Sequence, residues 1–190
     1  MCGKTSILHS LLLSKHGLKL QHLHVFSTTL YQPVYEILKR AIEENRINGI
    51  NQYFHGYSNE DDVISVEDAP PHSIMVFDDI ASEKTNKMAD YYCRGRHKNI
   101  DSFYLCQTYF KIPKQLIRNN ANLIILFKQD VTNMKHIYNE HVSSDLTYKE
   151  FNDVCNLCWD KTYGYLVINK TRDKNNGRYK NTLNNIITFD

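Results

Sequence analysis

Helix-like and strand-like segments follow one another along the chain. Apolar residues three and four positions apart predict helices at 5–17, 33–47 and 84–97, and short apolar runs predict strands at 23–29, 72–80, 100–108 and 122–129. A polar loop is expected between 47 and 72, and a one- or two-turn helix after Pro113. Alternating strands and helices predict an α/β fold with a mostly parallel, helix-covered sheet.

The last third of the chain has weaker patterns. Residues 131–142 and 147–159 are predicted to be helical, and 163–171 and 185–190 to be strands. Residues 172–181 are predicted to form a turn between these strands, since Asn176-Gly177 is a hairpin signal. With 190 residues and 42% hydrophobic content, the chain has the size of one ordinary domain. We therefore expect a single domain over 1–190, with a C-terminal strand extension over about 160–190.

Composition narrows the class of protein. The sequence has no run of about 18–20 apolar residues and no signal-peptide pattern, which predicts a soluble, intracellular protein without a membrane span. Five cysteines at irregular spacing predict reduced thiols rather than a disulfide framework. The net charge is only +2, but basic residues cluster after position 93. Such clusters are either a solvated surface or contacts to phosphates.

The first residues, MCGKTSILHSLL, contain a candidate phosphate-binding element. Gly3-Lys4-Thr5-Ser6 matches the end of the G-x-x-x-x-G-K-[ST] loop and opens a helix, whose unpaired N–H groups favour phosphate. Lys4 would contact the outer phosphates of a nucleotide, and the Thr5 hydroxyl would bind Mg²⁺. The first half of the loop does not precede Gly3. The match is therefore either a coincidence or the end of a loop that starts upstream.

A second candidate element is the run IMVFDD at 74–79. A buried strand ending in Asp78 would place a carboxylate at the edge where α/β sheets bind ligands, and in P-loop enzymes that carboxylate binds Mg²⁺. Asp79 would polarise an attacking water as a general base. The alternative is that both acids only cap the next segment. The order and separation of this run and the Gly3 element favour a single nucleotide-hydrolysing site.

Three further candidates lie around the next predicted strand. Gln107 follows its apolar run, where a polar side chain would sense the γ-phosphate, although it could equally satisfy loose backbone groups. Arg94 and Arg96 precede the strand, and in an oligomer such arginines can act as fingers in a neighbour's site. Contact with DNA phosphates, or plain solvation, is the alternative for both arginines.

Two other patterns carry little chemistry. Cys155-x-x-Cys158 lacks the second pair that a zinc site needs and lies on an apolar helix face, so core packing is expected. The nine histidines show no H-x-x-x-H or H-E-x-x-H spacing, so a metal hydrolase has little support. Nucleotide binding is thus the chemistry that the motifs favour.

Three segments also carry a family resemblance. They are SIMVFDDI at 73–80, YYCRGRHKNIDSFYLCQTYFKIPKQLIRNNANLIILFK at 91–128, and YGYLVINKTR at 163–172. Together they resemble the poxvirus-type DNA-packaging ATPases of the FtsK/HerA superfamily, which also occur in large DNA viruses, virophages and Maverick/Polinton elements. The likeness runs from about Gly3 to Arg172 and is most specific from Arg94 to Lys128.

The resemblance implies a three-layer, additional-strand (RecA-like) P-loop ATPase with sheet order 5-1-4-3-2. It implies that ATP hydrolysis, with Mg²⁺, drives double-stranded DNA into capsids during virion assembly. The implied partners are the DNA, other copies of the chain in a pentameric or hexameric ring, and capsid or portal proteins. The implied location is the host cytoplasm or nucleus, at the site of virus assembly, or the virion itself.

The resemblance also assigns roles to individual residues. Phosphate binding falls to Gly3, Lys4, Thr5 and Ser6, and Mg²⁺ binding to Thr5 and Asp78. Asp79 stands at the catalytic acid, Gln107 at the polar sensor, and Arg94 or Arg96 at the finger. The DNA contacts suggested by the clustered charge are Lys98, Lys111, Lys114, Arg118 and Arg172.

The chain departs from the family at its front, because the first and central strand is absent together with the leading loop glycine. Loss of a central strand is costly, at about 1–3 kcal/mol for each buried unpaired amide. We therefore expect Met1 to lie inside a longer reading frame that encodes the strand, and the incomplete loop argues against ATP turnover by these residues alone. Two alternatives stay open: a nucleotide-binding scaffold subunit without turnover, and an FtsK/HerA-type motor for DNA transfer or repair.

Overall fold

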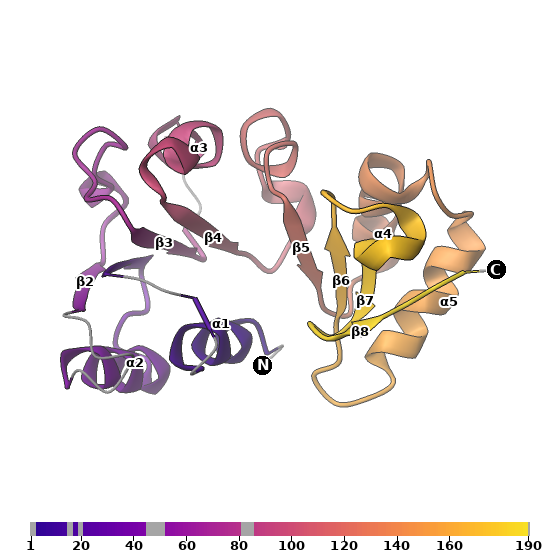
Figure 1. Cartoon of the computed structure of the whole chain (residues 1–190), viewed down its shortest axis with the longest axis horizontal. Coiled ribbons are helices and arrows are strands. Elements are labelled where there is room, and N and C mark those ends of the chain that lie inside the picture. The colour runs from indigo at the N-terminus through magenta and orange to yellow at the C-terminus, as the bar shows by residue number, and fades with distance from the viewer. Residues whose placement is uncertain (1–2, 15–16, 19–20, 45–51, 81–85, 190) are drawn as a thin grey trace. The chain divides into compact units, whose positions relative to one another are not determined.

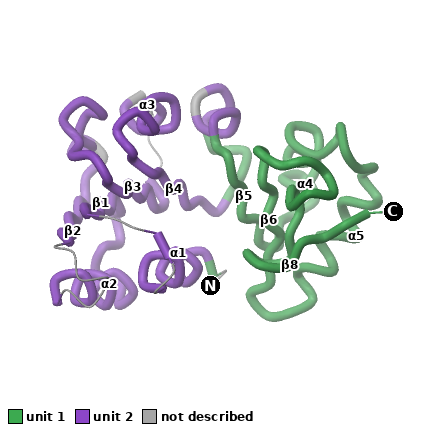
Figure 2. The backbone as a smooth tube through the Cα atoms, viewed as in Figure 1, with its two compact units in different colours: residues 1–3, 108–112, 121–190 green, residues 4–107, 113–120 purple. Residues whose placement is uncertain are grey.

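The computed structural model describes residues 3–14, 17–18, 21–44, 52–80 and 86–189. The chain divides into two compact units (Figure 2). Residues 4–107 and 113–120 form the first, which we call the parallel unit, and residues 1–3, 108–112 and 121–190 form the second, the antiparallel unit. Each name refers to the sheet that the unit contains.

The parallel unit is built on a four-stranded sheet in the order β2-β1-β3-β4, in which all neighbouring strands run parallel. The strands are β1 (His22–Ser27), β2 (Tyr53–Tyr57), β3 (Ser73–Asp78) and β4 (Asp101–Leu105). β3 is buried along its whole length, as its apolar run predicts. Among the described strands, β4 pairs with β3 alone.

Helices cover both faces of this sheet (Figure 1). They are α1 (Lys4–Leu13), α2 (Pro33–Glu43) and α3 (Asn86–Arg94). Side chains alternate between the two faces of a strand. Val25 and Val76 therefore pack with α1 and α2 on one face, whereas Phe26 and Phe77 pack with α3 on the other. The unit thus has three layers, and its short turns are η1 (Glu60–Asp62), η2 (Gly95–Lys98) and η4 (Lys114–Arg118).

The antiparallel unit contains a second four-stranded sheet, in the order β5-β6-β7-β8. Its strands are β5 (Leu123–Leu126), β6 (Leu166–Asn169), β7 (Tyr179–Asn181) and β8 (Asn185–Ile186). Its helical segments are η3 (Tyr109–Lys111), α4 (Val131–Ile137), η5 (Tyr138–Val142), α5 (Tyr148–Trp159) and η6 (Lys174–Arg178). The inner faces of α4 and α5 pack against β6 in one apolar cluster.

The two cysteines of α5 belong to that apolar cluster. Cys155 and Cys158 are 0% and 2% exposed. Burial raises the pKa of both thiols, that of Cys158 to about 11. The prediction that these cysteines pack in the core is confirmed.

The observed elements differ from the sequence predictions in two places. β2 lies in the segment predicted to be a polar loop, since Gly56 and His55 interrupt its short apolar pattern. In the antiparallel unit, β7 occupies part of the predicted turn, and all strand pairs are antiparallel. The mostly parallel sheet is therefore observed in the parallel unit only.

Four sequence-based expectations concern the chain as a whole. Within the described ranges, no helix combines the length and the apolar content that a bilayer crossing needs. The expectation of one domain over 1–190 stays a prediction, and so does the strand extension over about 160–190. The expected strand before Gly3 would lie beside β4 in the order implied by the resemblance, and it too stays a prediction.

Candidate functional site

Polar side chains collect at the carboxyl end of the parallel sheet. Ser27 ends β1, Asp78 ends β3, and Gln107 follows β4 by two residues. Ser27 is aligned with Asp78, and Asp78 is aligned with Leu105, in the two strand pairings. Because the strands are parallel, these residues meet at one edge, which is where open α/β sheets bind their ligands.

Asp78 is a buried carboxylic acid, with 7% of its surface exposed. Burial raises its pKa, because water no longer stabilises the charged form. Two neighbours oppose this effect. The hydroxyl of Tyr35, which lies on α2, donates a 2.5 Å hydrogen bond to Asp78 Oδ2, and the positive charge of Lys4 also lowers the pKa. The Asp78 carboxyl group thus accepts a hydrogen bond from α2 and is influenced by the positive charge of Lys4, the first residue of α1.

Asp79 lies next to this buried acid in an unusual backbone conformation. Its φ of 52° is in the left-handed region, which is uncommon for a residue other than glycine and tends to occur at functional sites. Its N–H donates to the Leu105 carbonyl at 3.0 Å, which fixes the turn after β3. The side chain is exposed, and Gln107 Nε2 donates a hydrogen bond to its Oδ2 at 3.3 Å. The exposed acid is therefore oriented by the residue that follows the neighbouring strand.

The start of α1 supplies backbone donors and a cation. Gly3 has a φ of 76°, which glycine adopts without strain, and the helix begins at Lys4. The first N–H groups of a helix have no partner within the helix and favour an anion. Lys4 and Thr5 are half-buried and Ser6 is exposed. Buried Leu8 and Leu12 hold the helix on the sheet face from which Asp78 also projects.

The donor set at this edge suits Mg²⁺. Hydroxyl and carboxylate oxygens are its preferred ligands, and in nucleotide sites it takes one or two protein ligands beside phosphates and water. Thr5 and Asp78 offer one hydroxyl and one carboxylate. A cation also suits the buried carboxyl, whose pKa is raised by desolvation and lowered by the charge of Lys4. The residues present therefore fit the ion.

Arg94 and Arg96 lie away from this edge. They belong to the end of α3 and to η2, which leads into the first residue of β4. The His72 N–H, just before β3, donates to the Lys98 carbonyl at 3.3 Å, so this basic turn lies at the amino end of β3. The five residues of β3 that follow Ser73 span roughly 16 Å. Neither arginine therefore reaches Asp78 of its own chain.

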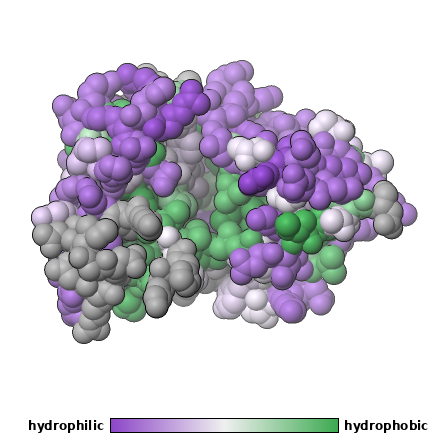
Figure 3. Space-filling view, viewed as in Figure 1, coloured by the Kyte–Doolittle hydropathy of each residue, from purple (hydrophilic) through white to green (hydrophobic). Residues whose placement is uncertain are grey.

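The two arginines differ in their own surroundings. Arg94 pairs at the surface with Glu67 at 2.5 Å and with Asp90 at 2.8 Å. Arg96 is exposed, and its guanidinium has no hydrogen-bond or ion-pair partner among the residues that the structure describes. The surface over α3 is hydrophilic, as Figure 3 shows. Arg96 is thus available to another molecule, whereas Arg94 is already held by two carboxylates.

The predicted DNA contacts fall into different environments. The Lys98 ammonium donates to the carbonyls of Val66, Glu67 and Ala69 at 3.1, 2.6 and 2.9 Å, which uses its three donors. Arg118 is buried, with 7% of its surface exposed. Both placements speak against contact with DNA. The exposed members of the set are Lys111, Lys114 and Arg172.

Two residues of the edge were not singled out from the sequence. Tyr35 is 2% exposed, and its hydroxyl also hydrogen-bonds the Ser27 side chain. Ser27 Oγ in turn accepts a hydrogen bond from the Thr29 N–H at 3.1 Å. The signal for Ser27 was its place at the end of a predicted strand. A tyrosine on the inner face of a predicted helix gives no such signal, because aromatic residues there are usually core.

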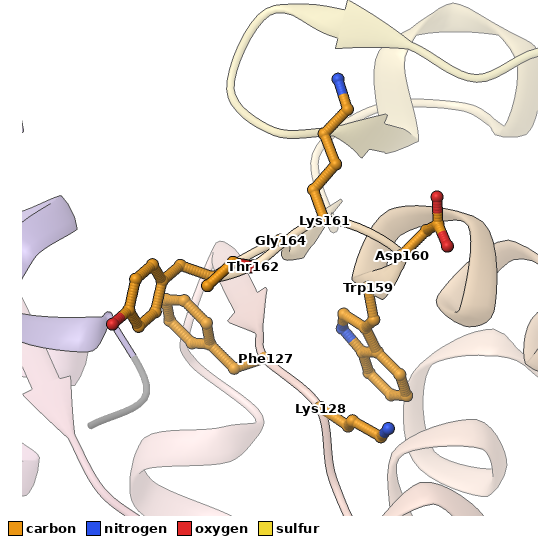
Figure 4. A pocket seen from close by; sticks show the side chains of 8 residues that line it. Phe127, Lys128, Trp159, Asp160, Lys161, Thr162 and Gly164 are labelled. Atoms are coloured by element: carbon orange, nitrogen blue, oxygen red, sulfur yellow. The ribbon is translucent and has the colours of Figure 1, made fainter.

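A separate pocket belongs to the antiparallel unit (Figure 4). It encloses about 410 Å³ and is lined by Phe127, Lys128 and residues 159–164. The Trp159 indole forms one side and is fixed by a 3.0 Å hydrogen bond from its Nε1 to the Leu126 carbonyl. None of the residues predicted to bind phosphate or Mg²⁺ lines this pocket. Phe127 and Tyr163 of this lining nevertheless lie next to Gly3, because a Cβ added at Gly3 would be 3.0 Å from the Phe127 ring and 3.5 Å from Tyr163 Cβ.

Comparison with known proteins gives one informative result. No protein-family model matches the chain, and no curated protein matches it. A solved structure does: the genome packaging NTPase B204 from Sulfolobus turreted icosahedral virus 2, in complex with AMP. The match covers 90% of this chain and 88% of that chain, with a TM-score of 0.55 and 13% sequence identity. The chain shares its fold with a viral genome-packaging NTPase. At 13% identity the likeness concerns the fold alone, and it does not assign the chain to the poxvirus-type subfamily.

Proposed function

We propose that this protein is an ATP-driven translocase that packages double-stranded viral or virus-like DNA into capsids. The observation that carries the proposal is the acidic pair at the end of β3. Asp78 is buried beside Lys4 and Tyr35, and the adjacent Asp79 is hydrogen-bonded to Gln107. The fold shared with a packaging NTPase supports the same function.

The start of α1 would bind the nucleotide. Backbone N–H groups at Gly3, Lys4, Thr5 and Ser6 would surround the phosphates, with the Lys4 ammonium neutralising the outer ones. The Thr5 hydroxyl and the Asp78 carboxylate would hold Mg²⁺, which when bound offsets the charge that builds up on the transferred phosphoryl group. Tyr35 supports this role, because its hydrogen bond favours the ionised form of Asp78.

Asp79 would act as the general base of hydrolysis. Its carboxylate would accept a proton from water as the water oxygen bonds to the γ-phosphorus and the bond to the β-phosphate oxygen breaks, releasing ADP. Gln107 would hold the carboxylate in position and would respond to the presence of the γ-phosphate. The 3.3 Å contact between their side chains supports this pairing.

The finer parts of the proposal concern assembly. The additional-strand P-loop fold would place a first strand beside β4, whose only partner in the described sheet is β3. Subunits would form a pentameric or hexameric ring around DNA, docked on capsid or portal proteins inside the host cell. Arg94 or Arg96 would then complete the site of a neighbouring subunit, and the distance of both residues from the site of their own chain supports this role.

The test is ATP hydrolysis with and without duplex DNA. It should be measured on the 190 residues and, if the reading frame extends upstream of Met1, on the extended chain as well. We expect turnover that rises with duplex DNA and falls at least tenfold in Asp78→Asn. Asp101→Asn, an exposed acid at the start of β4, is the matched control and should hydrolyse ATP normally. Nucleotide binding without turnover in either chain would point instead to a scaffold subunit.

A further inference from the structure

Three histidines come together on two neighbouring strands of the parallel sheet, β1 and the edge strand β2. His22 and His24 are two residues apart on β1 and so project from the same face. The strand register places His55 of β2 directly beside His24. One ring nitrogen from each of the three lies within 4.8 Å of the other two.

The three imidazole rings are closely packed. The His24 and His55 rings are stacked with their centroids 4.4 Å apart and an interplanar angle of 15°. The His22 and His55 rings are 5.8 Å apart at 20°. The lone pair of an imidazole nitrogen lies in the plane of its ring, so these stacked rings would have to tilt for their nitrogens, already within 4.8 Å of one another, to face one ion.

The ring nitrogens have unmet hydrogen-bonding capacity. His22 Nδ1, His24 Nε2 and His55 Nε2 are buried and have no hydrogen-bond partner in the described structure. Buried polar atoms are normally paired, so three such nitrogens in one cluster need an explanation. The Tyr57 hydroxyl lies 3.4 Å from His24 Nδ1. With the proton on Nδ1 and directed at that oxygen, His24 Nε2 carries the lone pair that a metal requires.

We propose that His22, His24 and His55 bind one transition-metal ion, with Zn²⁺ as the ion that their chemistry suits. Imidazole nitrogens are borderline ligands that favour Zn²⁺ over Mg²⁺, and three of them leave a fourth tetrahedral position for water. Zn–N bonds of about 2.0–2.1 Å place tetrahedral nitrogens about 3.4 Å apart. Metal binding would therefore draw the three nitrogens closer than the 4.8 Å within which they now lie and tilt the stacked rings.

The electrostatics of the cluster agree with its geometry. Burial lowers the pKa of all three histidines, that of His24 to about 4, and His24 is further affected by its two histidine neighbours. The rings are therefore neutral at pH 7, which is the form that binds metal.

This metal site is separate from the phosphate edge. Asp78 projects from the sheet face that α1 and α2 cover, next to Tyr35 of α2. His24 is aligned with Met75, which packs on the opposite face with α3. The cluster joins β1 to β2, an edge strand of its sheet. A bound ion would therefore hold the edge strand β2 to β1. This metal site does not depend on ATP hydrolysis.

The test begins with the full chain stripped of metal by a chelator. We expect one Zn²⁺ per chain in a calorimetric titration and a rise in unfolding temperature of several degrees at saturation. Co²⁺ in the same site should show the intense visible absorption of tetrahedral coordination. His55→Gln, at a half-buried position, should weaken Zn²⁺ binding at least tenfold. His97→Gln removes an exposed histidine of η2 and is the matched control, with no change expected.

Several outcomes would overturn the proposal. One is a Co²⁺ spectrum of octahedral type in the unmodified chain, which needs no variant to fold. Others are Zn²⁺ binding that His55→Gln leaves unchanged, or that His97→Gln weakens as much. Stacked neutral rings that serve only as packing would give no saturable Zn²⁺ binding and no shift in the unfolding temperature.

Discussion

At the residue scale, the pKa of Asp78 is set by its burial and by three neighbouring residues. Burial raises its pKa, the Tyr35 hydroxyl and the Lys4 charge lower it, and the adjacent Asp79 raises it. When folding raises the pKa of an acid, the free energy of unfolding of the protein falls as the pH rises through that pKa. The reason is that the acid ionises more easily in the unfolded chain. Tyr35 limits this loss by hydrogen-bonding the ionised form.

Removal of the Tyr35 hydroxyl should therefore destabilise the protein in a pH-dependent way. In Tyr35→Phe, a buried oxygen of Asp78 loses its donor, which should cost about 1–3 kcal/mol of unfolding free energy at pH 7. The loss should shrink as the pH is lowered toward 4 and Asp78 takes up a proton. Urea denaturation at several pH values measures it. Tyr31→Phe, at a position that is 79% exposed, is the control and should have no effect.

Asp79 should matter for hydrolysis and not for binding. In Asp79→Asn the amide can no longer accept a proton from water, so we expect ATP hydrolysis to slow at least tenfold while nucleotide affinity is retained. Single-turnover hydrolysis and equilibrium nucleotide binding separate the two effects. An unchanged hydrolysis rate would remove Asp79 from the mechanism.

Sequence patterns predicted some residues of the edge and missed others, for physical reasons. Asp78, Asp79 and Gln107 follow predicted strands, and parallel strands that end at one edge bring such residues together. Tyr35 depends on a contact between residues 43 positions apart, which no local pattern reveals. The histidine cluster does not match H-x-x-x-H or H-E-x-x-H, which are helical spacings, because His22 and His24 have the two-residue spacing of a strand and His55 comes from a different strand.

At the scale of elements, the local sequence predicts an element correctly when the structure of that element depends mainly on its own residues. α5 is an example, since Thr147 and Glu150 form a capping box: Thr147 Oγ1 accepts from the Glu150 N–H at 3.3 Å, and Glu150 Oε2 accepts from the Thr147 N–H at 2.6 Å. The pairing direction of β5–β8 is a different matter. It depends on contacts between segments, so apolar runs could not distinguish an antiparallel sheet from a parallel one.

The α5 cap allows a direct test of that local signal. Thr147→Ala should lower the unfolding free energy by about 1 kcal/mol, because the first turn of α5 loses its side-chain acceptor. Thr147→Ser keeps the hydroxyl and should be nearly neutral. Thr162→Ala, at an exposed position, is the control. Chemical denaturation gives all three values, and a neutral Thr147→Ala would show that the cap adds nothing measurable to stability.

At the scale of the whole molecule, the fold of this chain resembles that of the packaging NTPase B204 although the two sequences differ at most positions. A match over 90% of the chain at 13% identity means that the layers are shared while most side chains differ. The likeness therefore concerns the arrangement of the layers alone, and any function must be argued from the side chains of this chain. That is why the assignment of an arginine finger needs an experiment on an assembly.

The finger hypothesis predicts a difference between the two arginines. Arg96 has no partner within the described structure and should be the finger, whereas Arg94 is held by Glu67 and Asp90. Mixed assemblies with a minority of Arg96→Ala subunits should therefore lose ATPase activity more than in proportion to their content. Arg94→Ala should dilute the activity in proportion. If instead Arg96→Ala weakens duplex DNA binding in a salt-dependent way and leaves basal turnover intact, the residue contacts DNA.

The buried cysteine pair of α5 has a practical consequence. Alkylating reagents attack thiolates that they can reach, so Cys155 and Cys158 should react only when the antiparallel unit opens. Cys93 is exposed in the parallel unit and should react at once. A time course of alkylation, resolved by peptide mass, would therefore report the rate at which the antiparallel unit opens, with the immediate reaction of Cys93 as the reference.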